Sequence, residues 1–297
     1  MSDDASGSTL TSASSAGLVL VSVPIGNLGD MTPRAREALA AADLVLCEDS
    51  RVTRRLLAAL GIGARLQPLH DHNEAREVEG LLARLAAGAR LALVSDAGTP
   101  LLSDPGYRLV RAAIAAGHRV TAVPGANAAL MALTLSGLPP YPFLFLGFLP
   151  PRAAARRAAF ADVRRWEAAG LNTTLIWHEA PHRLAEALAD AEAVLGPREA
   201  AVARELTKHF EEVRRGTLAQ LAAHYATHEA RGEITLVVAG AVAEARTEED
   251  LDVLLRRALA ETSLKEAVAR VAAATGRPRR EVYALALRAS QARPGGE

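Results

Sequence analysis

The chain has 297 residues, of which 50% are hydrophobic and 23% charged, the composition of an ordinary globular protein with room for about two domains. Its 34 basic and 34 acidic residues cancel, so no global field draws it to nucleic acid or to an anionic membrane, and any such partner must bind a local patch. Cys47 is the only cysteine, which excludes an internal disulfide and a thiolate metal cluster and is typical of a reducing compartment.

Residues 1–17 predict a disordered N-terminal tail. They are rich in serine, glycine and alanine, and Asp3 and Asp4 stand where a secretory signal would carry positive charge. Further along, no apolar run reaches the roughly 18 to 20 residues that a membrane-spanning helix needs. We therefore expect a cytoplasmic protein with no membrane partner.

From residue 18 to residue 138 the sequence predicts an N-terminal α/β domain. Short apolar runs alternate there with helical patterns, which is typical of βαβ units around a parallel sheet. A capping residue before proline, at Thr32-Pro33 and at Asp104-Pro105, predicts the start of a helix. Helix ends are expected at Gly61, Gly88 and Gly117. The expected strands are residues 18–23, 44–48, 65–69, 91–95 and 119–123.

A second α/β domain is expected over residues 139–243. The Gly-Leu-Pro-Pro-Tyr-Pro stretch at 137–142 is the densest group of chain-breaking residues inside the folded region and marks the boundary. Strands are expected at residues 143–148, 173–178, 200–203 and 233–239, with helices near 153–168, 182–194 and 217–230. Residues 247–290 switch to helix alone, in three short pieces that begin near Thr247, Ser263 and Pro278, an order that allows a helix-turn-helix.

Ligands of open parallel sheets bind beyond the carboxyl ends of the strands, so the loops after the expected strands are the candidate sites. The first loop, residues 24–30, lacks the G-x-G-x-x-G spacing, and the chain has no G-x-x-x-x-G-K-[ST] motif. Both facts argue against nicotinamide and P-loop nucleotide binding. By its spacing alone, this loop is equally well explained as a plain connecting turn.

The second and third loops carry charged and imidazole side chains. Glu48, Asp49 and Arg51 form either a polar site or a strand-end cap with an ion pair, and the structural explanation is favoured. His70 and His72 could chelate a metal, but no third ligand stands in a matching context, so we expect no metal site. A histidine beside a carboxylate at a strand end can also handle a proton or contact an RNA phosphate.

The fourth loop, residues 95–100, is the most distinctive. It places Asp96, small residues and a proline directly after an apolar strand, and the approach to the next helix is longer than a connector needs. An Asx-turn leading into that helix is the structural alternative, but we favour a ligand site. The fifth loop, residues 123–129, has small residues at the start of a helix, where a ligand can lie against exposed N–H groups.

Together these loops resemble one known family. The segments that carry the likeness are PIGNLGD, CEDSR, LHDHNE, VSDAGTPLLSDPGYRLV, VPGANAAL, GFLPPR, WHEAPHRL, ARELTKHFEE and GEITLVV. In this order and spacing they resemble the bacterial small-subunit ribosomal RNA ribose 2′-O-methyltransferase I family, within the tetrapyrrole methylase superfamily, over about residues 18–240. The helical tail is similar to that family's C-terminal helix-turn-helix. The Ser-rich N-terminal extension, Ala126-Asn127 and Trp177-His178 depart from the usual pattern.

The resemblance implies an α/β fold: two α/β domains of tetrapyrrole methylase type with a cofactor cleft between them, a small C-terminal helical appendage, and usually a homodimer. It implies S-adenosylmethionine as the cofactor and 2′-O-methylation of a cytidine ribose (cytidine 1402) in the decoding centre of 16S rRNA, offered as free rRNA or as the assembled small ribosomal subunit. The implied cofactor contacts are Pro24 beside the cofactor, Asp96, Ala97, Gly98 and Thr99 at its ribose and methionine portions, Asn127 and Ala128 at its carboxylate end, and His178 and Ala203 near its adenine.

The implied reaction mainly needs an oxygen aligned with the S–CH3 bond and a site that excludes water. A ribose hydroxyl is a poor nucleophile, so a carboxylate or an imidazole can accept its proton. Glu48, Asp49 and His70 are the candidates by position. Methylation of a base nitrogen would instead need stacking aromatic residues, and only 4% of the chain is aromatic. A ribose acceptor is therefore expected.

A local basic patch follows the motif at residues 147–152. Five arginines against one aspartate lie between residues 152 and 165, and we expect Arg152, Arg156 and Arg157, together with Arg51, to contact RNA phosphates. A solvated helix face is the alternative. Two other functions stay open: methylation of a porphyrin-like macrocycle or a protein side chain, and a non-enzymatic RNA-binding module with a degenerate cleft. Calorimetric titration with the cofactor would separate the last of these.

Overall fold

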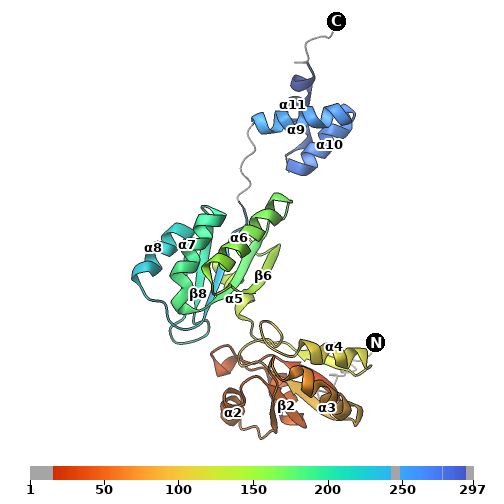
Figure 1. The fold of residues 1–297 in the computed structure, drawn as a ribbon, viewed down its shortest axis with the longest axis vertical. Helices are drawn as coiled ribbons and strands as arrows, with labels where there is room; N and C mark the ends of the chain where they lie inside the picture. The colour runs from red at the N-terminus through yellow and green to blue at the C-terminus, as the bar shows by residue number, and fades with distance from the viewer. Residues whose placement is uncertain (1–15, 242–247, 276, 292–297) are drawn as a thin grey trace, which may run out of the picture. The chain divides into compact units, whose positions relative to one another are not determined.

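The computed structural model of this chain describes residues 16–241, 248–275 and 277–291, and Figure 1 shows its ribbon. It divides into two units, Met1–Gly240 and Ala241–Glu297. Two five-stranded sheets form the larger unit. Of the expected N-terminal tail, residues 1–15 lie outside the described residues, and Gly17 already begins the first strand.

The first sheet is parallel throughout, with the strand order β3-β2-β4-β1-β5. Its strands are β1 (Gly17–Val21), β2 (Leu44–Cys47), β3 (Leu66–Pro68), β4 (Arg90–Leu93) and β5 (Val120–Val123). All five expected strands are confirmed, and four of them end earlier than their apolar runs. The difference arises because burial continues past the last ladder bond: Val23 and Val94 are buried although they follow the ends of β1 and β4.

Helices cover both faces of this sheet. Successive strand residues point to opposite faces, so Val19 and Val45 pack with α1 and α2, whereas Leu18 and Leu46 pack with α3 and α4. Burial on both sides explains why the strands are continuous apolar runs rather than alternating ones. The helices are α1 (Pro33–Ala41), α2 (Ser50–Ala59), α3 (Glu74–Ala86) and α4 (Tyr107–Ala115), and a single 3-10 turn, η1 (Leu28–Asp30), precedes α1.

Most of the helix signals in this half are confirmed. Thr32 caps α1, its Oγ1 accepting a hydrogen bond from the N–H of Ala35 at 3.2 Å, and Pro33 is the first helical residue. Left-handed glycines follow the ends of α2, α3 and α4, which lets the chain leave each helix without a Cβ clash. These are Gly61, Gly88 and Gly117, at φ +70°, +86° and +75°.

The second pair of a capping residue and a proline, Asp104-Pro105, does not start a helix. This corrects the expectation from the sequence. The next helix, α4, begins at Tyr107, with Gly106 at its N-cap at φ +121°, a conformation that L side chains rarely adopt. A Cβ added to Gly106 would lie 2.5 Å from Leu93 Cδ2, so this close turn needs glycine. Asp104 therefore has no capping role and instead lines a cavity.

The second sheet is mixed, with the order β6-β7-β10-β8-β9. Only β6 and β7 are parallel, and the other neighbours are antiparallel. Its strands are β6 (Phe143–Phe148), β7 (Thr174–Glu179), β8 (Glu199–Arg204), β9 (Glu212–Thr217) and β10 (Ile234–Val238). The four expected strands are confirmed. The sequence analysis missed β9, because the segment E-V-R-R-G-T has no apolar run, as is common for a charged strand at a sheet edge.

One face of the second sheet is covered by the three expected helices, as Figure 1 shows. These are α6 (Ala153–Ala168), α7 (Leu184–Leu195) and α8 (Leu218–Thr227), and a 3-10 turn, η2 (Pro181–Arg183), precedes α7. Their apolar stripes enclose Leu175, Trp177 and Leu236 of the sheet. Thr217 and Gln220 form a capping box at the start of α8.

The other face of the second sheet is covered by α5 (Ala128–Ser136). Leu133 of this helix packs with Ile176 and Val237 of the sheet. The helix precedes the expected boundary at residues 137–142, yet its core contacts are with the second sheet. Ile25, from the loop after β1, joins the same cluster, which holds that loop against the second sheet.

The described residues of the smaller unit form three helices around their own core: α9 (Glu248–Glu261), α10 (Leu264–Thr275) and α11 (Arg279–Gln291). Leu255, Val271 and Val282 are at its centre. The starts expected near Ser263 and Pro278 are confirmed to within a residue, whereas Thr247 lies outside the described residues. In the described part of the chain, no helix is both long and apolar enough to cross a membrane.

Candidate active site

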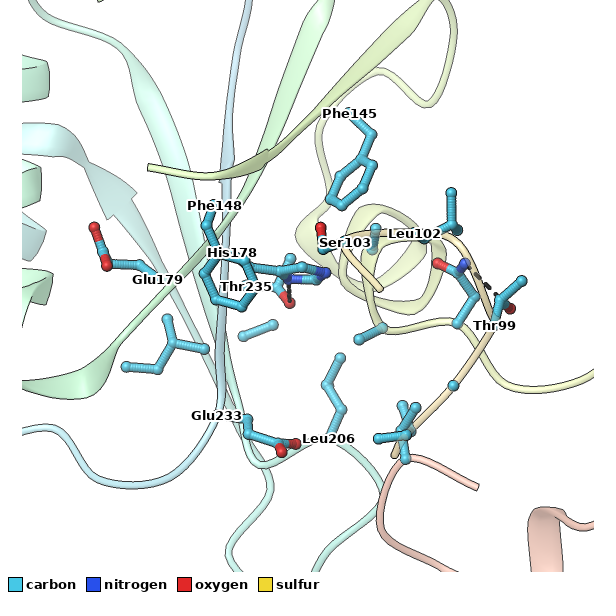
Figure 2. A pocket seen from close by; sticks show the side chains of 18 of the residues that line it. Thr99, Leu102, Ser103, Phe145, Phe148, His178, Glu179, Leu206, Glu233 and Thr235 are labelled. Carbon is cyan, nitrogen blue, oxygen red and sulfur yellow. Dashed lines mark hydrogen bonds between the residues drawn. The ribbon is translucent and has the colours of Figure 1, made fainter. Parts of the chain in front are cut away.

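A cavity of about 350 Å³ lies between the loops of the first sheet and the strand ends of the second. Its volume falls within the range of roughly 300 to 1,000 Å³ that is usual for small-molecule sites. One wall is formed by the loop after β4 and the start of α5, and the other by the ends of β6, β7 and β8 and the start of β10. Figure 2 shows His178 reaching from the second sheet toward Ser103 on the opposite wall.

The loop after β4 is pinned to the loop after β1. The N–H of Val23 donates to the carbonyl of Gly98 at 2.9 Å, and the N–H of Gly98 donates back to the carbonyl of Val23 at 3.1 Å. Gly98 has φ +74°, and a Cβ there would lie 3.2 Å from Ile25 Cγ2 and 3.5 Å from the carbonyl oxygen of Ala126. Both the backbone angle and the close approach explain the glycine.

Thr99 and Asn127 join this loop to the start of α5. Thr99 Oγ1 donates to the carbonyl of Ala126 at 3.1 Å and lies 3.5 Å from Asn127 Nδ2, a contact that is dashed in Figure 2. Asn127 Oδ1 caps the helix by accepting from the N–H of Leu130 at 3.0 Å. The N–H groups of Ala128, the first helical residue, and of its neighbour precede the first intrahelical bond. These two N–H groups are therefore available to a ligand at the N-terminal end of α5.

The segment that follows, residues 101–106, is strained. Leu101 and Ser103 have φ of +74° and +73°, a region that costs a non-glycine residue on the order of 1 to 3 kcal/mol. Leu102 and Ser103 line the cavity and lie along one side of it in Figure 2. Strain of this kind persists only where the surroundings enforce it and is concentrated at functional sites.

Three carboxyl groups are close enough to affect one another's charge: those of Asp96 and Asp104 on this wall and that of Glu48 beside it. Asp104 lines the cavity and lies beside Glu48, which follows β2. Burial, together with the negative charges of Glu48 and Asp96, raises the pKa of Asp104 to about 7. Asp96 also lines the cavity, and its Oδ1 accepts the N–H of Asp49 at 3.0 Å. The loops after β2 and β4 thus meet through these groups.

The cavity wall is acidic. Four of its lining residues are aspartate or glutamate and none is lysine or arginine. On the far wall, Glu179 accepts from Arg183 Nε at 2.8 Å and Glu233 pairs with Lys208 at 3.0 Å. The uncompensated negative charge therefore lies on the side of the loop after β4 and favours a cationic group there. Within the described residues, no three His, Cys, Asp or Glu side chains are grouped to hold a metal ion.

Aromatic rings form the opposite side of the cavity. The rings of Phe145 and Phe148 lie 5.1 Å and 5.4 Å from that of His178. Residues three apart in a strand would face opposite sides, but a register shift between these two phenylalanines, with Gly147 at φ +68°, puts both against the same histidine. His178 Nδ1 lies 3.1 Å from Thr235 Oγ1, and burial lowers the pKa of His178. The imidazole is therefore neutral at pH 7.

The structure gathers most of the expected cofactor contacts around this cavity. Eight of the nine line it: Asp96, Ala97, Gly98, Thr99, Asn127, Ala128, His178 and Ala203. The ninth, Pro24, does not, whereas its neighbour Ile25 does. The lining comes from segments that are far apart in the sequence, and the sequence analysis placed them together only through the family resemblance.

The three expected proton acceptors do not line the cavity. Asp49 caps α2, accepting the N–H of Arg51 at 2.8 Å, and pairs with the Arg51 guanidinium at 2.7 Å. The hydrogen bonds from Arg51 lower the pKa of Asp49 to about 2, which makes it a poor base, and the cap-and-ion-pair alternative describes this pair. Glu48 is exposed and reaches the cavity through Asp104. His70 remains outside the lining.

The expected arginine patch needs a correction. Arg156 is only 1% exposed, and its Nε donates to the buried Asp190 at 2.7 Å. It occupies the same buried stripe of α6 as Phe160 and Val163, so its guanidinium faces the core and cannot contact RNA. Arg157 also pairs with Asp190, at 2.5 Å, but stays 62% exposed. Arg152 is exposed at the N-cap of α6, and these two remain predicted contacts.

Sequence reasoning missed Asp104. It expected the aromatic stretch 141–148 near the cleft, but not that Phe145 and Phe148 both face His178. Asp104 was assigned as a helix cap, although Gly106 two residues later is a signal that the helix begins after it. Gly147 inside an apolar strand is a known signal of a bulge, and the bulge explains how Phe145 and Phe148 reach one site. The aromatic content of the whole chain, 4%, does not indicate that Phe145 and Phe148 lie together at this cavity.

Comparison with known proteins agrees with this architecture. A family model described as Tetrapyrrole (Corrin/Porphyrin) Methylases matches residues 17–222, and one described as RsmI C-terminal HTH domain matches residues 245–290. Among solved structures, the methyltransferase CobJ is similar with a TM-score of 0.55 at 19% identity, covering 76% of this chain and 95% of that one. This likeness shows the fold.

Curated relatives are more similar in sequence. A protein from Mesorhizobium japonicum named ribosomal RNA small subunit methyltransferase I is 48% identical over 268 residues, which is 90% of each chain. One of the same name from Micromonospora olivasterospora is 47% identical over 279 residues, covering 91% of this chain and 86% of that one. With its fold, its cavity and these matches along nearly its whole length, the chain belongs to the ribosomal RNA small subunit methyltransferase I family of the tetrapyrrole methylases and is a methyltransferase.

Proposed function

We propose that this methyltransferase transfers a methyl group from S-adenosylmethionine to the ribose 2′-hydroxyl of a cytidine in the decoding centre of small-subunit rRNA. The observation that carries the proposal is the cavity, whose loop Asp96–Thr99 and helix start at Asn127 stand where the resemblance requires the cofactor. Relatives at up to 48% identity are named for methylation of small-subunit rRNA. Such a substrate implies action in the cytoplasm, where bacterial ribosomes are assembled.

The residues around the cavity fit S-adenosylmethionine. Its sulfonium suits the uncompensated carboxylates of Asp96 and Asp104, and its carboxylate suits the N–H groups at the start of α5. Phe148 and the neutral His178 offer ring faces for an adenine. Gly98 brings bare backbone to the wall. The sulfonium, the carboxylate and the adenine thus each have a partner of matching chemistry.

When bound, S-adenosylmethionine supplies a methyl group that its sulfonium activates. The chain's residues then align and shield the acceptor. The pinned loop at Gly98 and the strained segment 101–106 fix the wall, which lowers the entropic cost of alignment. Phe145, Phe148 and Leu206 line the remaining sides with apolar atoms, so little water accompanies the hydroxyl.

An RNA substrate is favoured over a porphyrin-like macrocycle. Macrocycles of that class carry several carboxylates, which the acidic wall would repel. Arg152 and Arg157 remain exposed for phosphates on α6. The smaller unit adds Arg279 and Arg280 at the start of α11, followed by the exposed Tyr283. In a three-helix variant of the helix-turn-helix, the homeodomain, the third helix contacts nucleic acid.

We also propose a homodimer, as the resemblance implies. The helix α5 is apolar on nearly all sides and leaves Leu130 and Met131 46% and 40% exposed. A helix that is apolar all round is normally buried. Sedimentation of the full chain over a concentration series tests this proposal, and a monomer at all concentrations would contradict it.

The test of the reaction is a transfer assay with tritiated methyl donor. Naked small-subunit rRNA, intact small subunits and a porphyrinoid are offered side by side. Label is expected in rRNA and not in the porphyrinoid, and its linkage should resist alkali. Replacement of the target nucleotide by its 2′-deoxy form should abolish transfer while binding persists. Methylation of the deoxy substrate would show that the acceptor is a base atom. The variant Asp96→Ala should stay folded and lose donor affinity.

A further inference from the structure

We propose that Asp104, which lies beside Glu48 at the cavity wall, accepts the proton that the ribose 2′-hydroxyl loses on methylation. This inference rests on the proposed function and adds the group that removes the proton. None of the candidates expected from the sequence lines the cavity, whereas Asp104 does. Its carboxyl group can therefore touch a substrate that enters there.

Among the four lining carboxylates, the others already have donors. Glu179 is held by Arg183, and Glu233 by Lys208. Asp96 Oδ1 receives the N–H of Asp49 at 3.0 Å. These contacts already occupy carboxylate oxygens that could otherwise accept a proton. The side chain of Asp104 instead lies beside another acid, Glu48.

The neighbourhood of Asp104 makes it a base of suitable strength. Burial and the charges of Glu48 and Asp96, the acidic groups that face it, raise its pKa to about 7. A general base is most effective when its pKa lies near the working pH. Glu48, beside Asp104, is exposed to solvent, so the accepted proton can leave Asp104 to water on this side of the wall.

The charges balance in this step. The 2′-oxygen forms a bond to the methyl carbon as the carbon–sulfur bond of the donor breaks, with its electron pair going to sulfur. The O–H bond breaks, and Asp104 takes the proton. One positive and one negative charge disappear together, so the buried site ends the step without a net charge change, which a low-dielectric cavity favours.

The same arrangement predicts that the methyl donor and its demethylated product release different numbers of protons when they bind. A sulfonium near Asp104 favours the ionised carboxylate, so S-adenosylmethionine should displace the proton that the free protein holds at pH 7. S-adenosylhomocysteine lacks that positive charge and should displace less. Calorimetry in buffers of different ionisation enthalpy measures the protons released. With a pKa of about 7, Asp104 holds about half a proton at pH 7, so we expect S-adenosylmethionine to release more protons than S-adenosylhomocysteine, by at most about half a proton.

Three variants of the full chain test the assignment. Asp104→Asn should abolish the difference in proton release and slow single-turnover methyl transfer by about 10²- to 10⁴-fold, the usual contribution of a general base. Glu48→Gln removes a neighbouring charge, so the acid limb of its pH–rate profile should move to lower pH. Asp43→Asn is the matched control, because Asp43 pairs with Arg90 at the opposite end of β2 and should leave both measurements at wild-type values.

The outcomes separate this inference from the proposed function. If the wild-type chain neither binds S-adenosylmethionine nor methylates small-subunit rRNA, both are wrong. If the wild type does both, and a folded Asp104→Asn variant keeps the wild-type rate, pH profile and proton release, only the role of Asp104 is overturned. An unshifted profile in Glu48→Gln would also overturn it, and this result does not depend on the folding of Asp104→Asn.

Discussion

Replacing Arg156 by alanine should destabilise the larger unit and leave RNA binding unchanged. Arg156 and Asp190 are 1% and 5% exposed in their side chains and joined by a hydrogen bond of 2.7 Å. Removing one partner of a buried ion pair costs about 3 to 5 kcal/mol, because the other charge is left without compensation. Asp190 retains Arg157 at 2.5 Å, so we expect the lower end, about 3 kcal/mol.

Thermal unfolding followed by circular dichroism measures this loss. At about 2 to 4 °C per kcal/mol for a unit of this size, the melting temperature should fall by roughly 6 to 12 °C. Arg152→Ala is the matched control on the same helix: it is exposed, so it should leave the melting temperature nearly unchanged. In RNA binding over a salt series, Arg152→Ala alone should lower the log–log slope, by about 0.7 to 0.9.

The pH dependence of the stability difference between the wild type and Arg156→Ala gives a further check. Burial alone would raise the pKa of Asp190, but hydrogen bonds from Arg157 and Arg156 outweigh it, so the pKa is lowered from 3.8. A carboxylate with a depressed pKa stabilises the folded state at neutral pH and loses that effect as the pH falls through its folded pKa. The difference in the free energy of unfolding between the wild type and Arg156→Ala should therefore become smaller below about pH 4. A stable Arg156→Ala variant with a reduced salt slope would refute this account.

Three other perturbations follow from the site and the smaller unit. Gly98→Ala forces a side chain into φ +74° and within 3.2 Å of Ile25. Calorimetry should therefore show about tenfold weaker binding of S-adenosylmethionine, from roughly 1 to 2 kcal/mol of strain. Binding with wild-type affinity would contradict the conclusion that this turn needs glycine. The double variant Arg279→Ala, Arg280→Ala should lower the salt slope of RNA binding by about 0.7 to 0.9 per lost contact, and an unchanged slope would exclude this helix end. Because burial lowers the pKa of His178, the free energy of unfolding should rise with pH up to about 6.5, and His178→Asn should remove that rise in denaturant titrations.

Much of the fold could be predicted because its signals are local. Continuous apolar runs mark the strands of the parallel sheet, and Thr32-Pro33 with the three left-handed glycines marks helix ends. The signals failed where tertiary contacts decide the outcome. The edge strand β9 has no apolar run, and the charged Arg156 lies on a buried helix stripe because Asp190 of another helix compensates it.

The site was predictable in its loops and unpredictable in its chemistry. The residues from Asp96 to Thr99 are distinctive in sequence, and they do line the cavity. Which acid lines the cavity depends on a two-residue displacement of a helix start at Gly106. The partnership of Glu48 with Asp104 joins residues 56 positions apart, and no periodicity in one sequence reports such a contact.

The packing of α5 has a consequence for dissecting the chain. The visible boundary at residues 137–142 separates this helix from the sheet that it covers. A fragment cut there would expose Ile176 and Val237 to water in one piece and leave a mostly apolar helix uncovered at the end of the other, and both pieces should aggregate. During synthesis on the ribosome the helix emerges before the sheet, so the last helix of the first half must wait for the second half before it can be buried.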